Sequence, residues 1–453
     1  MTAKEKRVIA IHLPQFHPFK ENDEWWGMGF TEWTNVTKAK PRYEGHYQPH
    51  LPTDTGFYDL RLPESRKLQA DLAKQYGIYG FCYYHYWFNG KQLMERPVNE
   101  ILSSGEPDFP FMLCWANENW ARNWDGGFTD VLIKQDYSVQ DDMDHMRWLC
   151  KNVFPDRRYI RVSGKPVFAV YRTSLFPNVK ETISVWRRIA AEEFGIELYL
   201  IETKFPGDIA NRNLLTEGFD AAMDFQPIGV MVSKILREKV KLLNPKDNSD
   251  FPEVYNYSDY VDYCKASELP DRCFPCVSPG FDNSPRRVGK TFLSFTETSP
   301  NKYGDWLMNE LCRGTSFQDD EENFVFINAW NEWAEGNHIE PDIRWGRKYL
   351  EKTKETIDLY NKKGVPVDYD KQRKKAYEVY LKKHKGEIHE REMLQEYNLC
   401  KDVIKAKDNS YYVAKQFIKS RRKHMLLKYN IKLMYKLVYY KKVKTLFDKS
   451  YNT

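Results

Sequence analysis

Short apolar runs alternate with longer amphipathic segments along most of the chain. Several of the short runs are almost continuously apolar, which is typical of parallel strands buried on both faces. The segments between them carry apolar residues at helical spacing, as Leu68, Leu72 and Tyr76 do in the first of them. The runs predicted as strands are Val8–Leu13, Gly80–Tyr86, Phe111–Ala116, Val167–Tyr171, Leu198–Glu202, Ala221–Phe225, Phe274–Ser278 and Phe324–Ala329. The segments predicted as helices are Pro63–Tyr76, Gln140–Val153, Val179–Phe194, Tyr303–Arg313 and Gly346–Tyr360.

Eight strands that alternate with helices predict an α/β fold, a closed (β/α)8 TIM barrel over residues 1–361. A doubly wound open sheet is the alternative, and it usually has a glycine-rich phosphate turn after its first strand. Here the first strand continues into His12-Leu-Pro-Gln-Phe-His17 without a glycine cluster, which favours the barrel. Two long loops, residues 14–60 and 229–272, are expected to carry function or elements of their own, and the second is predicted to be partly helical.

The charge of the chain is unevenly distributed. The whole chain carries +5, but residues 401–453 contain 15 Lys or Arg, three Asp and no Glu, so this segment carries +12 and the rest −7. Residues 362–453 are predicted to form a basic, mostly helical extension. Basic amphipathic helices bind anionic membrane surfaces. The alternatives are a solvated helical appendage or a segment that binds another protein. Nucleic acid is not an expected partner, because the segment lacks a recognised reader motif.

Neither an export signal nor a membrane span is evident in the sequence. It lacks a run of about 18 apolar residues, and the apolar segment that starts at Val8 is too short for a secretory signal. The eight cysteines are scattered, so we expect reduced thiols in a cytoplasmic protein, peripheral at the inner membrane face if the basic tail binds there. Cys273-Phe-Pro-Cys276 has the CxxC spacing, but a redox or zinc role would need a helix N-terminus or a second ligand pair.

Polar and aromatic side chains gather where the predicted strands end. In a (β/α)8 barrel the working residues sit at the carboxyl ends of the strands. Aromatic residues make up 15% of the chain, and their rings suit the apolar faces of sugars. Neither a metal site nor a cofactor site is predicted. The residues predicted to bind substrate are His12, Gln15, Tyr84, His85, Trp87, Trp115, Asn117, Glu118, Trp120, Tyr171, Asp282, Asn331 and Trp333.

Each of these residues also has a purely structural alternative. The aromatic and amide side chains can equally pack in the barrel interior. For Glu118 the preferred alternative is a buried ion pair with Arg122. The first long loop carries four residues that either roof the cleft or form the core of the loop: Trp25, Trp26, Glu32 and Trp33.

The most informative segment follows the eighth predicted strand, where Glu332 and Glu335 lie three residues apart beside Trp330 and Trp333. Cleavage of a glycoside needs one group that protonates the leaving oxygen and a second that handles the nucleophile, and both are typically carboxyl groups. The tryptophans can desolvate one glutamate and raise its pKa. Residues i and i+3 of a strand face opposite ways, so a joint role requires the chain to turn at Trp333, and Gly336 suits a turn. The alternative is a salt-bridged rim.

At this point the sequence resembles glycoside hydrolase family 99, the endo-α-mannosidases and endo-α-mannanases. The similarity is greatest to its WbsX-like branch, which occurs in bacterial polysaccharide biosynthesis clusters and is often labelled glycosyltransferase. The resemblance covers roughly residues 7–360. It is carried by His12-Leu-Pro-Gln-Phe-His17, Trp26-Gly-Met-Gly-Phe-Thr-Glu-Trp33, Gly80-Phe-Cys-Tyr-Tyr-His-Tyr-Trp87, Trp115-Ala-Asn-Glu-Asn-Trp120 and Asn331-Glu-Trp-Ala-Glu-Gly336 followed by Ile339-Glu-Pro341.

The resemblance implies a retaining mechanism in which the 2-hydroxyl of an α-manno-configured sugar attacks its own anomeric carbon and forms a 1,2-anhydro sugar. Glu332 would be the base for that hydroxyl and Glu335 the acid for the leaving oxygen. The residues by themselves leave a direct carboxylate nucleophile open.

The function expected is therefore cleavage or transfer of α-linked glycosidic bonds in an oligosaccharide or polysaccharide, in surface polysaccharide (O-antigen or capsule) metabolism. A lipid-linked form of the substrate fits that setting, and no cofactor is expected. The alternatives are a glycosyltransferase that uses an activated sugar, or a non-catalytic glycan-binding barrel. The sequence has neither an Asp-x-Asp motif nor a doubly wound nucleotide site, which counts against the first alternative. It keeps both glutamates, which counts against the second.

Overall fold

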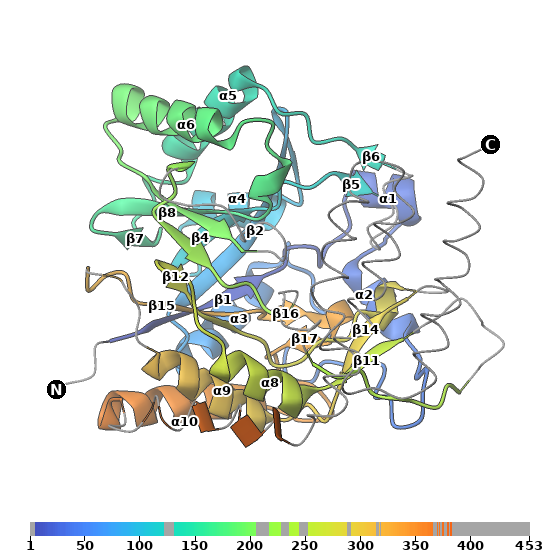
Figure 1. Cartoon of the computed structure of the whole chain (residues 1–453). Helices are drawn as coiled ribbons and strands as arrows, with labels where there is room; N and C mark the ends of the chain where they lie inside the picture. Colours follow the sequence, from blue (N-terminus) through green and yellow to red (C-terminus); the bar gives the residue numbers. More distant parts are fainter. Residues whose placement is uncertain are drawn as a thin grey trace, which may run out of the picture. The chain divides into compact units, whose positions relative to one another are not determined.

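The main body is a barrel of parallel strands with helices around it, as a computed structural model shows (Figure 1). The structure describes residues 5–121, 131–204, 217–227, 235–243, 252–287, 291–313, 317, 319–365 and scattered positions between 369 and 382. The predicted (β/α)8 fold is confirmed. All eight predicted strands are present, with ends that differ by a few residues from those expected. The barrel strands are β1 (Arg7–His12), β2 (Gly80–Phe88), β4 (Phe111–Trp115), β8 (Lys165–Val170), β9 (Tyr199–Thr203), β10 (Ala221–Met223), β12 (Cys273–Phe274) with β13 (Cys276–Val277), and β15 (Phe324–Ile327).

The barrel closes at the seventh predicted strand, which is divided into β12 and β13 and pairs with one neighbouring strand on each side. β12 pairs with β10, and β13 pairs with β15, in each case in parallel. Only Pro275 separates the two pieces, and proline has no N–H for a strand ladder. Its carbonyl still accepts a hydrogen bond from Phe326 N at 2.9 Å. Both cysteines of the CxxC run therefore lie in barrel strands, where they are buried free thiols.

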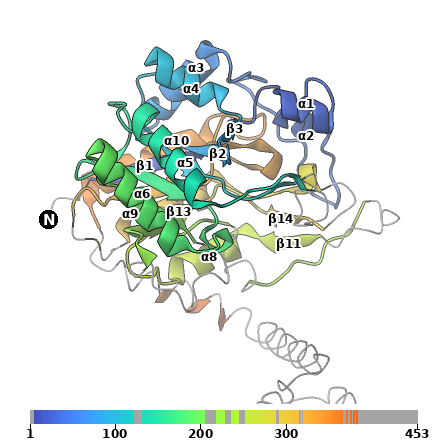
Figure 2. The ribbon, with the colours of Figure 1, turned by 90° about the horizontal axis from the view of Figure 1, so that it is seen from above.

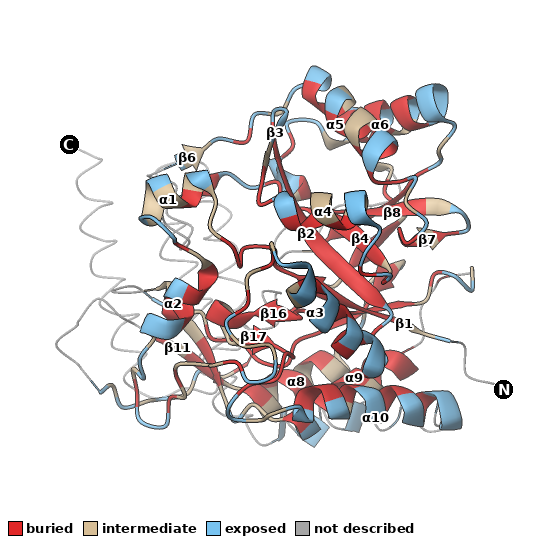
Figure 3. Ribbon diagram, turned by 180° about the vertical axis from the view of Figure 1, so that it is seen from behind, coloured by how far each residue is buried: buried red, intermediate tan, exposed pale blue. Residues whose placement is uncertain are grey.

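Amphipathic helices cover the outside of the barrel, as predicted. Figure 3 shows these helices buried toward the strands and exposed on the opposite face, and Figure 2 shows the same arrangement from above. Ser138 and Ser299 begin α5 and α9 by accepting hydrogen bonds from backbone N–H groups in the first turn. The predicted helices correspond to α3 (Pro63–Gln75), α5 (Val139–Asn152), α6 (Val179–Phe194), α9 (Pro300–Cys312) and α10 (Lys348–Lys363), and α4 (Arg96–Ser104) was not predicted.

Both long loops carry elements of their own. The loop after β1 contains α1 (Lys20–Trp26) and α2 (Glu32–Lys38). In the insertion after β10, β11 (Glu253–Asn256) leads directly into α8 (Tyr257–Ala266), so the partly helical prediction is confirmed for the described residues. β11 pairs in parallel with β14 (Leu293–Thr296), a ribbon that the sequence pattern did not indicate.

The basic tail lies outside the part of the chain that the structure describes, so residues 401–453 and most of the predicted extension 362–453 stay a prediction. Among the described residues, no helix has both the length and the apolar character that crossing a membrane requires.

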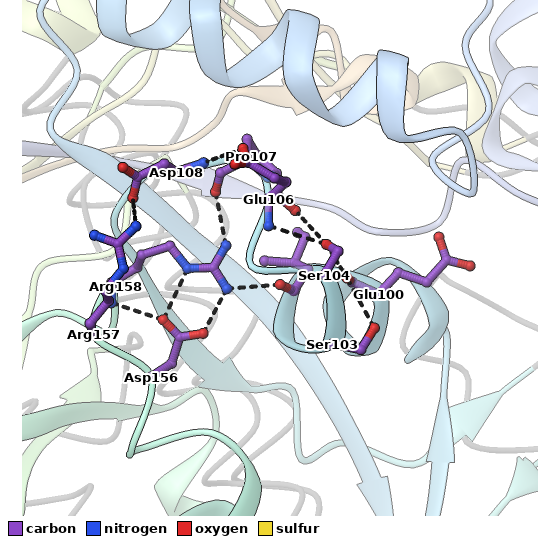
Figure 4. A network of polar contacts seen from close by, with 10 residues as sticks. Glu100, Ser103, Ser104, Glu106, Pro107, Asp108, Asp156, Arg157 and Arg158 are labelled. Carbon is purple, nitrogen blue, oxygen red and sulfur yellow. Dashed lines mark hydrogen bonds and ion pairs between the residues drawn. The ribbon is translucent and has the colours of Figure 1, made fainter.

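Arg158 holds several segments together at the amino-terminal end of β4 (Figure 4). This end of the barrel lies opposite the carboxyl ends of the strands. Its guanidinium donates to the Ile101 carbonyl at 2.8 Å, to the Pro107 carbonyl at 3.0 Å and to both oxygens of Asp156. The side chain is only 3% exposed, whereas that of its neighbour Arg157 is 78% exposed. Buried carbonyls that lose their donors are costly, so Arg158 stabilises the fold.

We predict that Arg158→Ala lowers the free energy of unfolding by about 2–5 kcal/mol, because two buried carbonyls and a carboxylate lose their donor. Arg157→Ala is the matched control and should change it by less than about 1 kcal/mol, because its pair with Asp108 is exposed. Urea unfolding of both variants measures the difference. Equal destabilisation by the two substitutions would contradict this reading of the network.

Candidate active site

Glu332 and Glu335 lie on a tight turn after the eighth barrel strand. β16 (Asn331–Glu332) pairs antiparallel with β17 (Asn337–His338), and the 3-10 turn η4 (Trp333–Glu335) joins them. Gly336 has φ 54°, a left-handed conformation that glycine adopts without strain. Residues three apart in a 3-10 turn lie on the same side. The turn predicted at Trp333 is therefore present, and it lets both carboxylates face one way.

A single buried arginine, Arg286, holds the two carboxylates and a third one, Glu32. Arg286 lies at the end of the 3-10 turn η3 (Ser284–Arg286). Its Nη2 donates to Glu332 Oε2 at 2.9 Å, its Nη1 to Glu335 Oε1 at 2.5 Å, and its Nε to Glu32 Oε1 at 2.7 Å. The Arg286 side chain is 4% exposed. One planar guanidinium thus fixes three carboxylates relative to one another.

The cluster is closed on one side and partly open on the other. Glu32, the first residue of α2, is fully buried, and Glu332 is 8% exposed. Glu335 is 19% exposed and is the member of the pair most accessible to a ligand. We expected Glu32 either to cover the cleft or to pack in the core of the loop. Its carboxylate belongs to the cluster, so neither description alone fits this residue.

Burial raises the pKa of Glu332 from 4.5 to about 8, and the charges of Glu335 and Glu32 act in the same direction, while Arg286 opposes them. Burial also raises the pKa of Glu335, again against the effect of Arg286. The physical cause is that one arginine cannot compensate three desolvated carboxylates. The raised pKa values of Glu332 and Glu335 favour a proton shared between them, which is what an acid and base pair requires.

Glu340, which the sequence analysis quoted only as part of a motif, anchors the turn from behind. Its Oε2 accepts from Tyr58 Oη at 2.9 Å and from Trp333 Nε1 at 2.7 Å. Its Oε1 accepts from Gln69 Nε2 at 2.8 Å and from Trp330 Nε1 at 2.9 Å. Both tryptophans that flank Glu332 are thereby fixed by one buried carboxylate.

Several residues predicted to bind substrate instead support the turn. Asn331 exchanges two hydrogen bonds with the backbone of Leu13 at the end of β1. The Asp282 backbone N–H donates to the Glu335 carbonyl at 2.5 Å, and its carboxylate accepts from His46 and Gln48. Trp333 is fully buried and donates to Glu340.

The two residues predicted at the end of β1 are also buried. His12 Nε2 lies 3.1 Å from Gln69 Oε1, within the network of Glu340. The backbone carbonyl of Gln15 accepts from Glu32 N at 3.2 Å, so this residue positions the start of α2.

Alternation along β2 divides its predicted residues between two faces. Burial raises the pKa of Tyr84 and of Tyr86, and the charge of Glu332 acts in the same direction on both phenols. His85 and Trp87 face the helix layer instead: His85 Nε2 lies 2.9 Å from His145 Nε2, and Trp87 donates to Asp141 on α5. Successive side chains of a strand point to opposite faces. The predicted substrate contacts of His85 and Trp87 are therefore not supported.

Trp115 shares this outward orientation, because its ring packs against His145, Trp186 and Phe176. Trp120 lies on the other side, with its ring centroid 5.4 Å from Tyr86 and 6.2 Å from Trp25.

Tyr171 continues this line of neighbouring rings, since its ring centroid is 5.8 Å from Tyr84. After burial, the charges of Glu118, Glu335 and Glu332 raise the pKa of Tyr171. We call Trp25, Trp120, Tyr86, Tyr84 and Tyr171 the aromatic row. It comes from four different regions of the chain.

Asn117 and Glu118 lie at the end of β4, next to the aromatic row. Asn117 is buried and bonds the backbone of Arg172 in both directions, with distances of 2.7 and 2.8 Å. Glu118 pairs with Arg172 at 2.8 Å and is exposed. The expected burial of Glu118 is therefore wrong, and its expected partner, Arg122, lies outside the residues that the structure describes.

Arg286 was missed by sequence reasoning. The available signal was an arginine pair that follows the end of the seventh strand at Asp282-Asn283. Its three partners lie 46, 49 and 254 residues away along the chain, so no local pattern links them.

The chain is similar to a known protein family and to two curated proteins. A family model described as glycosyltransferase WbsX matches residues 8–353. The chain is 40% identical over 356 residues to an uncharacterized protein WxcX of Xanthomonas campestris pv. campestris strain B100, covering 77% of this chain and 49% of that protein. WxcX of strain ATCC 33913 gives the same values. The chain thus spans about half the length of the curated relatives it matches.

Among solved structures, a family 99 endo-α-mannosidase from Bacteroides thetaiotaomicron is similar with a TM-score of 0.46 and 15% identity, over 79% of this chain and 98% of that chain. A protein described as glycoside hydrolase-like has a TM-score of 0.49 and 16% identity, over 79% of this chain and 95% of that chain.

We predict that Glu332→Gln removes part of the pH dependence of stability. In the folded protein the pKa of Glu332 is raised from 4.5 to about 8, so its contribution is fully present below pH 4.5 and is lost as the pH rises toward 8. Thermal unfolding between pH 5 and 8 should therefore show a shallower loss of stability in the variant than in the wild type. Parallel curves for the two proteins would contradict the raised pKa.

Proposed function

The chain belongs to the WbsX glycosyltransferase family, and from that membership we propose that it is a glycan-active enzyme that cleaves or transfers α-linked, manno-configured glycosidic bonds with retention. The observation that carries the proposal is the pair Glu332 and Glu335 on one buried arginine. Two carboxyl groups that share a proton next to an aromatic surface suit an acid and base at a sugar linkage.

In the proposed reaction, Glu332 takes the proton of the substrate's 2-hydroxyl while that oxygen forms a bond to the anomeric carbon. The bond from the anomeric carbon to the leaving oxygen breaks, and Glu335 gives that oxygen a proton. Water or an acceptor hydroxyl then opens the 1,2-anhydro ring and gives its proton to Glu335, and the 2-oxygen recovers its proton from Glu332. The cycle restores both residues.

The electrostatics of the cluster support a shared proton, because burial raises the pKa of both Glu332 and Glu335. The proposed roles need the proton on Glu335 at the moment of bond cleavage. A 2-hydroxyl that donates to Glu332 stabilises its charged form. Binding of the sugar would therefore move the proton to Glu335 and prepare the reaction.

The aromatic row supports a sugar as the ligand, because ring faces bind the apolar C–H faces of pyranoses while phenols reach their hydroxyls. An oligosaccharide or polysaccharide of bacterial surface polysaccharide metabolism, carried on a lipid, is the proposed substrate. An anionic membrane surface bound through residues 401–453 is the proposed location.

A glycosyltransferase that uses an activated sugar is the second candidate, and the description of the matching family model favours it. Titration with nucleotide sugars discriminates the two. Saturable binding that is competed by the free nucleotide would favour transfer from an activated donor.

We predict that Glu332→Gln and Glu335→Gln each lower turnover of an α-mannan oligosaccharide by about 10²–10⁴-fold, because each removes a proton-transfer step. With an α-mannosyl-mannoside of dinitrophenol, Glu335→Gln should recover the first step and release dinitrophenolate in a burst, because this leaving group departs without an acid, while the second step stays slow without its base. Glu332→Gln should not recover. Product release at the reducing end measures both.

The matched control is Glu322→Gln, which also removes a buried carboxylate paired with an arginine, Arg272, but at the other end of the barrel. It should retain turnover if the protein folds. Full activity of Glu332→Gln or Glu335→Gln would overturn the assignment, and recovery of Glu332→Gln alone would reverse the two roles.

A further inference from the structure

A second group of titratable side chains lies beside the catalytic turn and has no part in the proposed reaction. His50, His338 and Asp342 each offer a ligand atom, and these atoms all lie within 4.8 Å of one another. His50 Nδ1 is 3.1 Å from His338 Nε2, which is 3.8 Å from Asp342 Oδ2. His338 and Asp342 are buried, and His50 is half-buried.

Hydrogen bonds outside the group orient both imidazoles. His338 Nδ1 lies 3.1 Å from the backbone carbonyl of Glu340, which can only accept, so Nδ1 carries the hydrogen. In the neutral ring Nε2 then carries a lone pair, which points toward the group. The backbone of Tyr47 likewise hydrogen-bonds His50. A carbonyl that fixes the far nitrogen of the imidazole, as that of Glu340 does for His338, is the usual surrounding of a metal-binding histidine.

If the two histidines only form a hydrogen bond with each other, two hydrogen-bond acceptors of the group still face each other. If His50 Nδ1 donates to the lone pair of His338 Nε2, the carboxylate of Asp342 still faces that same atom at 3.8 Å. The other oxygen of Asp342 accepts from Trp345 N at 2.5 Å, which holds the carboxylate in place. A cation placed among the three ligand atoms would be attracted by all of them.

We propose that His50, His338 and Asp342 bind a divalent transition-metal ion of the zinc type. In a tetrahedral site with bonds of about 2.0–2.2 Å, ligand atoms lie roughly 3.3 Å apart; two of the observed distances are 3.1 and 3.8 Å, and the third pair, His50 and Asp342, lies within 4.8 Å and would have to move closer. Two imidazoles with one carboxylate suit zinc and its neighbours, whereas Mg²⁺ and Ca²⁺ prefer oxygen ligands alone. Three protein ligands leave a fourth position for water.

The place of the site suggests its effect. It joins the loop around His50 to the segment that follows β17, and His50 Cε1 would lie 3.5 Å from a Cβ at Gly336, directly beside Glu335. A bound ion would therefore brace the back of the catalytic turn. This inference stands on its own geometry and does not depend on the proposed reaction.

Zinc titration of the full chain tests the proposal. The protein is prepared without a polyhistidine tag, treated with a chelator, and titrated with Zn²⁺ and separately with Mg²⁺ by calorimetry. We expect one equivalent of Zn²⁺, a raised melting temperature in its presence, and no response to Mg²⁺. Asp342→Asn and His50→Gln should each weaken Zn²⁺ binding by about tenfold or more.

Asp54→Asn is the matched control, because Asp54 pairs with Arg347 on the surface outside the group, and it should bind Zn²⁺ like the wild type. Equal Zn²⁺ affinity in the wild type, Asp342→Asn and His50→Gln, or no stoichiometric binding, would overturn the proposal. If a variant fails to fold, anomalous diffraction from Zn²⁺-soaked wild-type crystals decides: a peak among the three side chains supports the site, and a peak elsewhere refutes it.

Discussion

The site depends on one electrostatic constraint, which is that the guanidinium of Arg286 is shared by three buried carboxylates. Arg286, with the charge of Arg287 also acting on Glu335, does not offset the desolvation of these carboxyl groups, and their raised pKa values favour a retained proton. The contact with Arg286 also fixes the direction of Glu332 and Glu335, since each meets a different nitrogen of a planar group. Geometry and proton content therefore have a common origin.

The rest of the molecule serves to bring these four side chains together and to keep them in place. The barrel supplies Glu332 and Glu335 after its last strand, the segment after its seventh strand supplies Arg286, and the first long loop supplies Glu32. Behind the turn, Glu340 accepts four hydrogen bonds and locks both flanking tryptophans. Buried networks of this kind are rigid only when every member has its partner.

Local patterns were sufficient for the strands, most of the helices and the glutamate pair, because apolar runs and the string around Glu332 lie within short stretches of sequence. They were insufficient for Arg286 and Glu340, whose partners are mostly distant along the chain. They also failed to show which residues of β2 face the site and which face the helices. All nine of its residues are buried, so its sequence does not reveal that Tyr84 faces the site and His85 the helices. Only the packing of α5 against the barrel decides this.

The proton content of the cluster is the central claim, and a carbon-13 NMR titration of the glutamate side-chain carboxyl carbons tests it most directly. Signals of Glu332 and Glu335 are assigned by their loss in the glutamine variants. The account predicts that at least one of them remains protonated at pH 7 and titrates well above 4.5, the ordinary glutamate value. If both carboxyls are ionised at pH 6 and titrate together near 4.5, the account is wrong.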